Sequence, residues 1–186
     1  MFRIVGIVFF VVFMHSAGGQ DLRSGLMVDA GYFGETLTKA GAVAAVQKSI
    51  SKESDRHRLR LNVIYYRHPG YNKNLLLLPE YLFRSTGKKG LFFEISAGGG
   101  WMYQKADKTI IAYTDGIFAE TNKGWSYLAP TIQLGIGKSL VKGPWSGMAF
   151  SAGLRWFGQL PFNDFMMHHL ALEGRVSVPL EFFSRQ

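Results

Sequence analysis

The sequence predicts an all-β protein, an up-and-down antiparallel transmembrane β-barrel of about eight strands. Three observations lead to this prediction. Apolar and polar residues alternate over stretches much longer than the usual strand of about 5–6 residues in a globular sheet. Aromatic residues gather toward the ends of these stretches. Arginines and glutamates occupy the polar positions, whereas most lysines lie in or beside the connections.

The amino-acid composition supports a membrane-embedded chain. The 186 residues include 22 glycines, 15% aromatic residues and only 18% charged residues. A soluble domain carries about 25% charged residues and about 7% glycine, and a disordered chain has few aromatic residues. The chain has no cysteine, which excludes a disulfide scaffold and any metal site or reaction based on thiols. No cofactor is expected.

Residues 1–19 are predicted to be a cleaved signal peptide. Arg3 supplies a positive start, an uninterrupted apolar run covers 4–14, and Ala17 and Gly19 are the small residues that a signal peptidase requires. The alternative, a membrane-anchoring helix, needs about 20 apolar residues, more than this run contains. The chain is therefore expected to be exported.

The barrel strands are assigned from their period of two, since successive side chains of a strand leave opposite faces. The runs 91–104 and 170–182 alternate most clearly; Glu94, for example, lies between Phe93 and Ile95. Short connections rich in Gly, Pro, Asn, Asp, Ser and Lys separate the runs. Read from the C-terminus, these signals predict strands near residues 167–183, 145–158, 125–140, 108–119, 90–104, 75–84 and 56–67.

One further strand is needed to close an eight-stranded barrel. The candidates are 25–36 and 38–50, and we favour 38–50 because it forms a tight hairpin with 56–67. The sequence leaves this choice open. The expected organisation is a signal peptide over 1–19, a lead-in segment or extra strand over 20–37, a β-barrel over 38–183 and a C-terminal tail over 184–186.

The apolar faces are expected to point outward to lipid. Phe93 and Trp101 lie eight residues apart on one face, about 26 Å along a strand. A strand tilt of about 40° reduces this to about 20 Å of depth, close to the apolar band of about 25 Å between two aromatic girdles. The residues expected in these girdles are Phe93, Trp101, Tyr103, Trp156 and Phe182.

The polar faces predict a closed interior. Arginine pairs well with carboxylates where water is scarce, and an eight-stranded barrel has room for little besides its own side chains. We therefore expect ion pairs, and not an aqueous channel, to fill the lumen. The residues expected in this network are Arg58, Arg60, Glu80, Arg84, Glu94, Arg155, Glu173, Arg175 and Glu181.

In pattern, the sequence resembles the small outer-membrane β-barrels of the OmpA/OmpX kind: a signal peptide, about eight alternating strands, aromatic girdles, and a last strand that runs to Phe182 and Phe183. The resemblance implies a monomer in the outer membrane of a diderm bacterium, inserted by the barrel-assembly machinery through its C-terminal strand. Such proteins commonly end on the aromatic residue, whereas Ser184, Arg185 and Gln186 follow here. An even strand count places both termini in the periplasm and predicts outward loops near 51–56, 85–90, 120–124 and 159–166.

The expected function is structural or interactive, without catalysis. Outward loops would meet lipopolysaccharide or a partner, and basic residues would contact lipid phosphates at the membrane surface. Nucleic acid is not an expected partner, because the chain, despite its net charge of +8, has neither a basic helix nor a run of lysines.

The main alternative is an outer-membrane lipid hydrolase or acyltransferase that uses His168 or His169 at the rim. Outer-membrane lipid hydrolases resemble this architecture, and those that remove acyl chains from lipid A have the Ser/His pair two residues apart on one strand. Here position 171 is Ala171, and Ser177 lies about 26 Å along the strand, so a serine must come from another strand. The histidines have no further ligands at metal-binding spacing, and no metal is expected. A further alternative is a soluble, secreted, lipocalin-like barrel that binds an apolar ligand.

Overall fold

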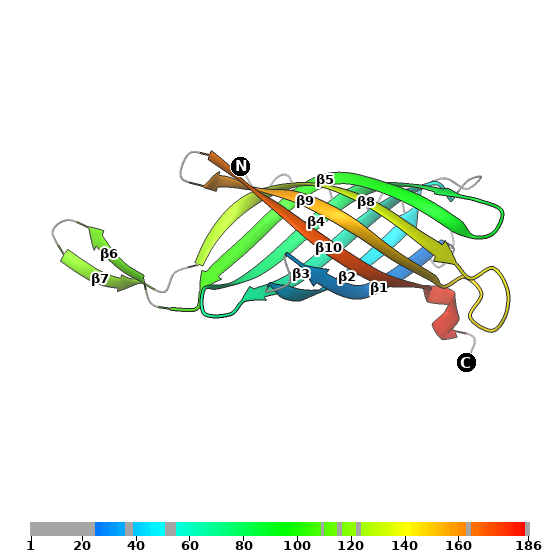
Figure 1. Ribbon diagram of the computed structural model, residues 1–186, viewed down its shortest axis with the longest axis horizontal. Coiled ribbons are helices and arrows are strands. Elements are labelled where there is room, and N and C mark those ends of the chain that lie inside the picture. The colour runs from blue at the N-terminus through cyan, green and yellow to red at the C-terminus, as the bar shows by residue number, and fades with distance from the viewer. Residues whose placement is uncertain are drawn as a thin grey trace.

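The chain folds into a closed antiparallel β-barrel of eight strands (Figure 1). The computed structural model describes residues 25–35, 39–50, 55–108, 110–114, 117–121, 124–162 and 165–184. The barrel strands are β1 (Leu26–Gly34), β2 (Ala40–Ser49), β3 (His57–His68), β4 (Asn72–Thr86), β5 (Leu91–Ala106), β8 (Gly124–Ser139), β9 (Ala149–Phe162) and β10 (Phe165–Pro179). The predicted fold class is confirmed. The predicted signal peptide, 1–19, lies outside the described residues.

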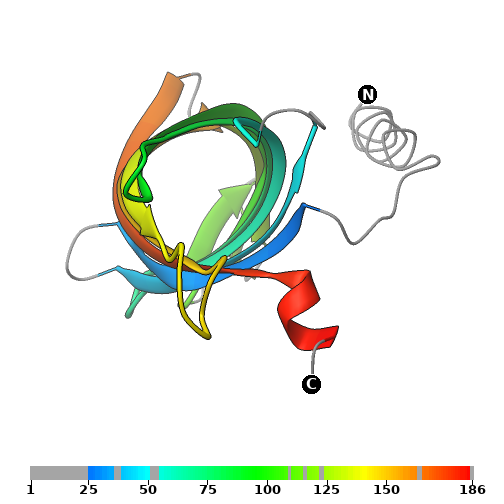
Figure 2. The same cartoon turned by 90° about the vertical axis from the view of Figure 1, so that its right-hand side faces the viewer.

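The barrel closes where its first strand meets its last. The order around the barrel is β1-β2-β3-β4-β5-β8-β9-β10. β1 pairs with β10 from Met27 opposite Pro179 to Gly34 opposite Leu172. Figure 2 looks along the barrel and shows the strands as a ring. Because the first and last strands pair with each other, the barrel has no free sheet edge.

One predicted barrel strand is wrong. Both 25–36 and 38–50 contribute a barrel strand, whereas 108–119 does not. Instead, β6 (Ile110–Thr114) and β7 (Ile117–Thr121) form a separate two-stranded hairpin that projects beyond the barrel (Figure 1). The dipeptide between them in the sequence, Asp-Gly, is one that two-residue hairpin connections favour. Exchanging one strand for another leaves the total at eight.

The exchange also changes which connections share an end of the barrel. We call the end where β1 begins and β10 stops the terminal end, and the opposite one the distal end. The connections from β2 to β3 and from β4 to β5, near the predicted 51–56 and 85–90, join strands at the terminal end, so their prediction as loops on the side away from the termini is wrong. The prediction takes 38–50 as the first strand, starting at the terminal end. Because β1 precedes it, β2 starts at the distal end instead, and β2, β3, β4 and β5 each run opposite to the predicted direction. The connections from β5 to β8 and from β9 to β10, near the predicted 120–124 and 159–166, do lie at the distal end, as does the hairpin.

The last strand ends earlier than predicted. β10 stops at Pro179, whose ring nitrogen has no hydrogen to donate to a neighbouring strand. A short 3₁₀ helix, η1 (Leu180–Ser184), follows. It carries Phe182, whose ring stacks on Trp145 of the β8–β9 connection with 5.8 Å between centroids. Within the ranges that the structure describes, no helix is long and apolar enough to cross a membrane.

Side chains of the barrel strands sort by face, with apolar residues outside. On β10, Leu172 is 57% exposed, whereas the next residue, Glu173, is 4% exposed. On β8, Leu134 is 47% exposed, whereas the neighbouring Gln133 is 1% exposed. This inverts the arrangement of a water-soluble protein, in which charged residues are almost never fully buried.

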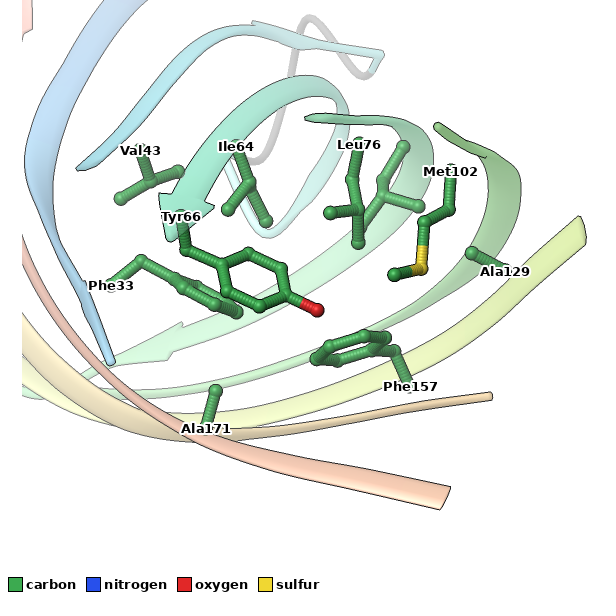
Figure 3. Packing of buried hydrophobic residues seen from close by; sticks show 10 residues of the cluster. Phe33, Val43, Ile64, Tyr66, Leu76, Met102, Ala129, Phe157 and Ala171 are labelled. Atoms are coloured by element: carbon green, nitrogen blue, oxygen red, sulfur yellow. The ribbon is translucent and has the colours of Figure 1, made fainter. Parts of the chain in front are cut away.

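The interior of the barrel has two layers. Polar and charged side chains fill the half nearer the terminal end, while an apolar cluster fills the half nearer the distal end (Figure 3). The apolar cluster comprises Phe33, Val43, Ile64, Tyr66, Leu76, Leu78, Met102, Ala129, Phe157 and Ala171. Within it, the rings of Phe33, Tyr66 and Phe157 lie 5.2–6.3 Å apart. This layer differs from the uniformly polar interior that the sequence predicts.

Candidate functional site

A row of paired charges fills the polar half of the lumen. Each member contacts a residue of opposite charge, and the members come from β1, β3, β4, β5, β9 and β10. In order they are Arg84, Glu94, Arg60, Glu80, Arg155, Glu173, Arg175 and Asp29. We call these eight residues the charge chain. Their side chains are at most 5% exposed, and four cations balance four carboxylates.

Glu80 of β4 lies at the centre of the charge chain. Arg60 donates to its Oε2 from Nη2 at 2.8 Å and from Nε at 3.2 Å. Arg155 pairs with the same carboxylate, and its Nη2 lies 3.3 Å from Oε2. The Ser96 hydroxyl donates to Oε2 at 2.9 Å and accepts from Arg60 at 2.7 Å. Two guanidinium groups and a hydroxyl thus replace the water that this carboxylate loses on burial.

One arm of the charge chain runs from Glu80 toward the terminal end. Glu94 of β5 accepts from Arg84 Nη2 at 2.9 Å and lies 3.6 Å from Arg60 Nη1. Gln133 of β8 donates to Glu94 Oε1 at 3.2 Å. The Arg84 guanidinium also lies 4.3 Å from the centre of the Phe92 ring, where the face of the ring attracts a cation.

The other arm crosses the seam between the last strand and the first. Glu173 of β10 accepts from Arg155 Nε at 2.5 Å and from Arg175 Nη2 at 2.7 Å. Arg175 donates to Asn62 Oδ1 at 2.8 Å and lies 3.7 Å from Asp29 Oδ2 of β1. The arm therefore connects β9, β10 and β1 electrostatically as well as through backbone hydrogen bonds.

Two residues predicted for the interior network are placed differently from the rest. Arg58 is buried at the terminal end, where it pairs with Asp55. It is linked to the charge chain through Gln47, which accepts from Arg58 at 3.4 Å and donates to Asp29 at 2.7 Å. Glu181 lies in η1, beyond the last strand, so its prediction as an interior residue is wrong.

A second polar group lies at the distal end of the lumen. His169 Nδ1 lies 2.7 Å from Glu35 Oε1, and its Nε2 lies 3.1 Å from Gln159 Oε1. The His169 ring stacks on Phe157 at 4.6 Å, while Lys39 Nζ donates to Glu35 at 2.9 Å. Burial alone would raise the pKa of Glu35, but the hydrogen bonds from His169 and Lys39 outweigh it and hold this pKa below its usual value.

Other contacts hold the histidine pair among the residues that the structure describes. The hydrogen bonds of His169 use both ring nitrogens, and His168 Nδ1 accepts from Trp156 Nε1 at 3.2 Å. None of the hydrogen bonds made by His168 or His169 within these ranges reaches a serine or threonine hydroxyl. Nor do three or more metal-ligating side chains gather anywhere in the described part of the chain.

Four of the five residues predicted for the aromatic girdles lie on the outer wall. Phe93 is 45% exposed near the terminal end of β5, and Trp101 is 37% exposed nearer the distal end. Trp101 stacks on Tyr103 at 5.8 Å, and Trp156 lies on the outer face of β9. Phe182 instead lies in η1, so its prediction as a strand residue is wrong.

Comparison with solved structures places this barrel among known ones. The chain is similar to neisserial surface protein A (NspA) from Neisseria, with a TM-score of 0.57 and 12% identity over 84% of this chain and 98% of that one. It has the fold of a small outer-membrane barrel. A second similar structure is the N-terminal β-barrel domain of OprF from Pseudomonas aeruginosa, with a TM-score of 0.50 and 13% identity over 82% of this chain and 96% of that one. No protein-family model matches the sequence, and the search of curated proteins finds no match.

Proposed function

We propose that this protein is a monomeric structural or interaction barrel of the outer membrane, with a closed lumen and no catalytic role. The observation that carries this proposal is the charge chain, eight neutralising charges buried inside a wall whose exposed face is apolar. Such an arrangement suits hydrocarbon outside and scarce water inside. A soluble lipocalin-type barrel needs the reverse, an apolar cavity within a polar wall.

The closed lumen makes a structural role more suitable than transport. Glu80 of β4 and its partners, Arg60 of β3 and Arg155 of β9, extend into the lumen and meet there. Each side chain is fully or almost fully buried. The apolar cluster at the distal half forms a second barrier, because rings and aliphatic side chains exclude water and ions. We therefore expect no ion conductance through the barrel.

The proposed orientation in the membrane follows from the fact that β1 begins and β10 stops at the same end of the barrel. Export removes residues 1–19, and the barrel-assembly machinery inserts the barrel with its terminal end in the periplasm. The distal end then faces outward and presents the hairpin of β6 and β7, the element that projects furthest (Figure 1). Lipopolysaccharide or a protein partner would meet the protein at this end.

The test combines fractionation with gel migration of the membrane fraction, with and without boiling. A folded membrane barrel is expected to shift in apparent size on heating, and N-terminal sequencing is expected to begin after residue 18 or 19. Purified protein in a planar bilayer should give no step currents. Recovery of the folded protein in the soluble periplasmic fraction, or stable channel currents, would contradict the proposal.

A further inference from the structure

Three cations form a row on the outer wall at the distal end. Arg67 of β3 lies opposite Lys73 of β4, and Lys73 lies opposite Lys105 of β5. Adjacent strands are about 4.8 Å apart, so the three side chains leave the wall side by side. The side chains of Arg67 and Lys73 are 50% and 48% exposed, and Lys105 is exposed. We call Arg67, Lys73 and Lys105 the cationic row.

From the cationic row toward the middle of the barrel, the outward residues of these three strands become apolar. The next outward rung is Tyr65, Leu75 and Tyr103, in register across the same strands. The rung after that is Val63, Leu77 and Trp101. All six lie on the outer face, and five are at least 37% exposed. The cations are followed by a rung with two tyrosines and then by a rung with two aliphatic residues and Trp101. Cations beside amphipathic aromatic rings, with apolar side chains below, are typical of a wall that passes from lipid headgroups to hydrocarbon.

The cationic row carries more positive charge than its neighbours balance. Asp107 is the carboxylate that faces it, 2.8 Å from Arg67 and 3.5 Å from Lys73. The hydrogen bond from Arg67 and the two positive charges hold the pKa of Asp107 below its usual value, so this carboxylate stays ionised at neutral pH. Within the described ranges no carboxylate pairs with Lys105, and Lys108, three residues further along the chain, is an exposed cation.

We propose that the cationic row binds the phosphate groups of a phosphorylated lipid in the adjoining outer leaflet, whose acyl chains lie along the aromatic and aliphatic rungs below. The proposal rests on the proposed function, because it needs the distal end to lie at the outer leaflet. Arginine binds phosphate through two parallel hydrogen bonds, and lysine binds it as a point charge. A soluble anion would contact the cations alone, whereas a lipid contacts all three rungs at once.

A matched pair of triple variants tests this proposal. One variant, Arg67→Gln, Lys73→Gln and Lys105→Gln, removes the cationic row. The control, Lys88→Gln, Lys89→Gln and Lys142→Gln, removes the same charge from exposed turns at the terminal end. The probe is lipid A with two phosphates, titrated against the full protein in nonionic detergent micelles, together with the same lipid after both phosphates are removed.

The expected result is loss of phosphate-dependent binding in the first variant alone. At about fivefold per cation near a charged surface, the dissociation constant should rise on the order of 100-fold, whereas the control should stay within about twofold of the unmodified protein. Removal of the phosphates from the lipid should weaken binding to the unmodified protein by a similar factor. Equal losses in both variants, or equal affinity for the two lipids, would overturn the proposal.

Gel migration of each variant separates this inference from the proposed function. A variant that retains the heat-dependent shift is a folded barrel, so its loss of binding reports on the cationic row. A protein that shifts on heating but binds both lipids alike refutes only the lipid site. A protein that is soluble and does not shift on heating overturns both.

Discussion

Replacing Glu80 with glutamine probes the centre of the charge chain. Glu80→Gln keeps the size of the side chain but removes the negative charge that faces Arg60 and Arg155. Both guanidinium groups are at most 1% exposed, so bulk water cannot solvate them once the carboxylate is gone. Glu94 and Glu173 each still hold one of these arginines, and one net positive charge stays buried.

The cost follows from the energetics of buried ion pairs. Removing one partner of a buried pair destabilises a protein by about 3–5 kcal/mol, because the remaining charge is left uncompensated. We expect the free energy of unfolding of Glu80→Gln to fall within this range. Glu181→Gln is the matched control, since it makes the same chemical change in η1 at a partly exposed position, where an ion pair contributes about 0–1 kcal/mol.

The assay is urea unfolding of the barrel in lipid vesicles, followed by tryptophan fluorescence and by the heat-dependent gel shift. The four tryptophans of the chain supply the signal. If Glu80→Gln unfolds at the same urea concentration as Glu181→Gln, then water screens the charges of the lumen and the reasoning fails.

Further predictions concern packing, pH and the hairpin. Gly98→Ala should lower the unfolding midpoint, because an added Cβ would lie 2.2 Å from the carbonyl oxygen of Pro79 on the adjacent strand; an unchanged midpoint in the urea assay would show that β4 and β5 separate easily. Since the folded pKa of Glu35 is lowered, its pairing with His169 stabilises the barrel above the usual glutamate pKa, and this gain is lost as the pH falls through the lower folded value. The difference in unfolding midpoint between Glu35→Gln and the unmodified protein should therefore be large at pH 7 and shrink below about pH 4; a constant difference would argue against the pairing. Replacing 110–121 with a short Gly/Ser linker should change the free energy of unfolding by less than about 1 kcal/mol, because β6 and β7 form a two-stranded sheet separate from that of the barrel; a larger loss would mean that the hairpin supports the barrel.

The outward alternation of the long strands could be predicted because a wall with an apolar outer face and a polar inner face imposes a period of two on the sequence. In the middle of β5 and β10 the outward residues are mostly apolar or small, so the apolar positions repeat at every second residue. Glu94 and Glu173 stand out between them, which is why these interior residues were recognisable from sequence alone.

β1 was harder to recognise because its inner face is apolar in part. Met27 and Phe33 are buried, and Phe33 belongs to the apolar cluster. The period of two is therefore weak, and Asp29, between them, was missed as a member of the charge chain. The sequence did carry one sign of its position: Asp29 lies an even number of residues from Met27 and Phe33, so all three side chains leave the same face of the strand.

The distal layer could not be predicted from alternation. Tyr66 and Phe157 are apolar residues on inward faces, where the pattern gives no contrast with the outward residues beside them. The pairs that join His169 to Glu35, or Arg175 to Asp29, connect residues more than a hundred positions apart. Only the closure of the barrel brings such partners together.

The contact between Arg175 and Asp29 has a consequence for assembly, since it joins the last barrel strand, β10, to the first, β1. A partly assembled sheet that lacks β10 leaves Asp29 without Arg175, and it removes Glu173 from Arg155, which keeps Glu80. Docking of β10 supplies the missing partner of Asp29 and the second carboxylate of Arg155 in the same step. Closure of the barrel is accordingly expected to be cooperative, with the pairing of β10 and β1 as its last step.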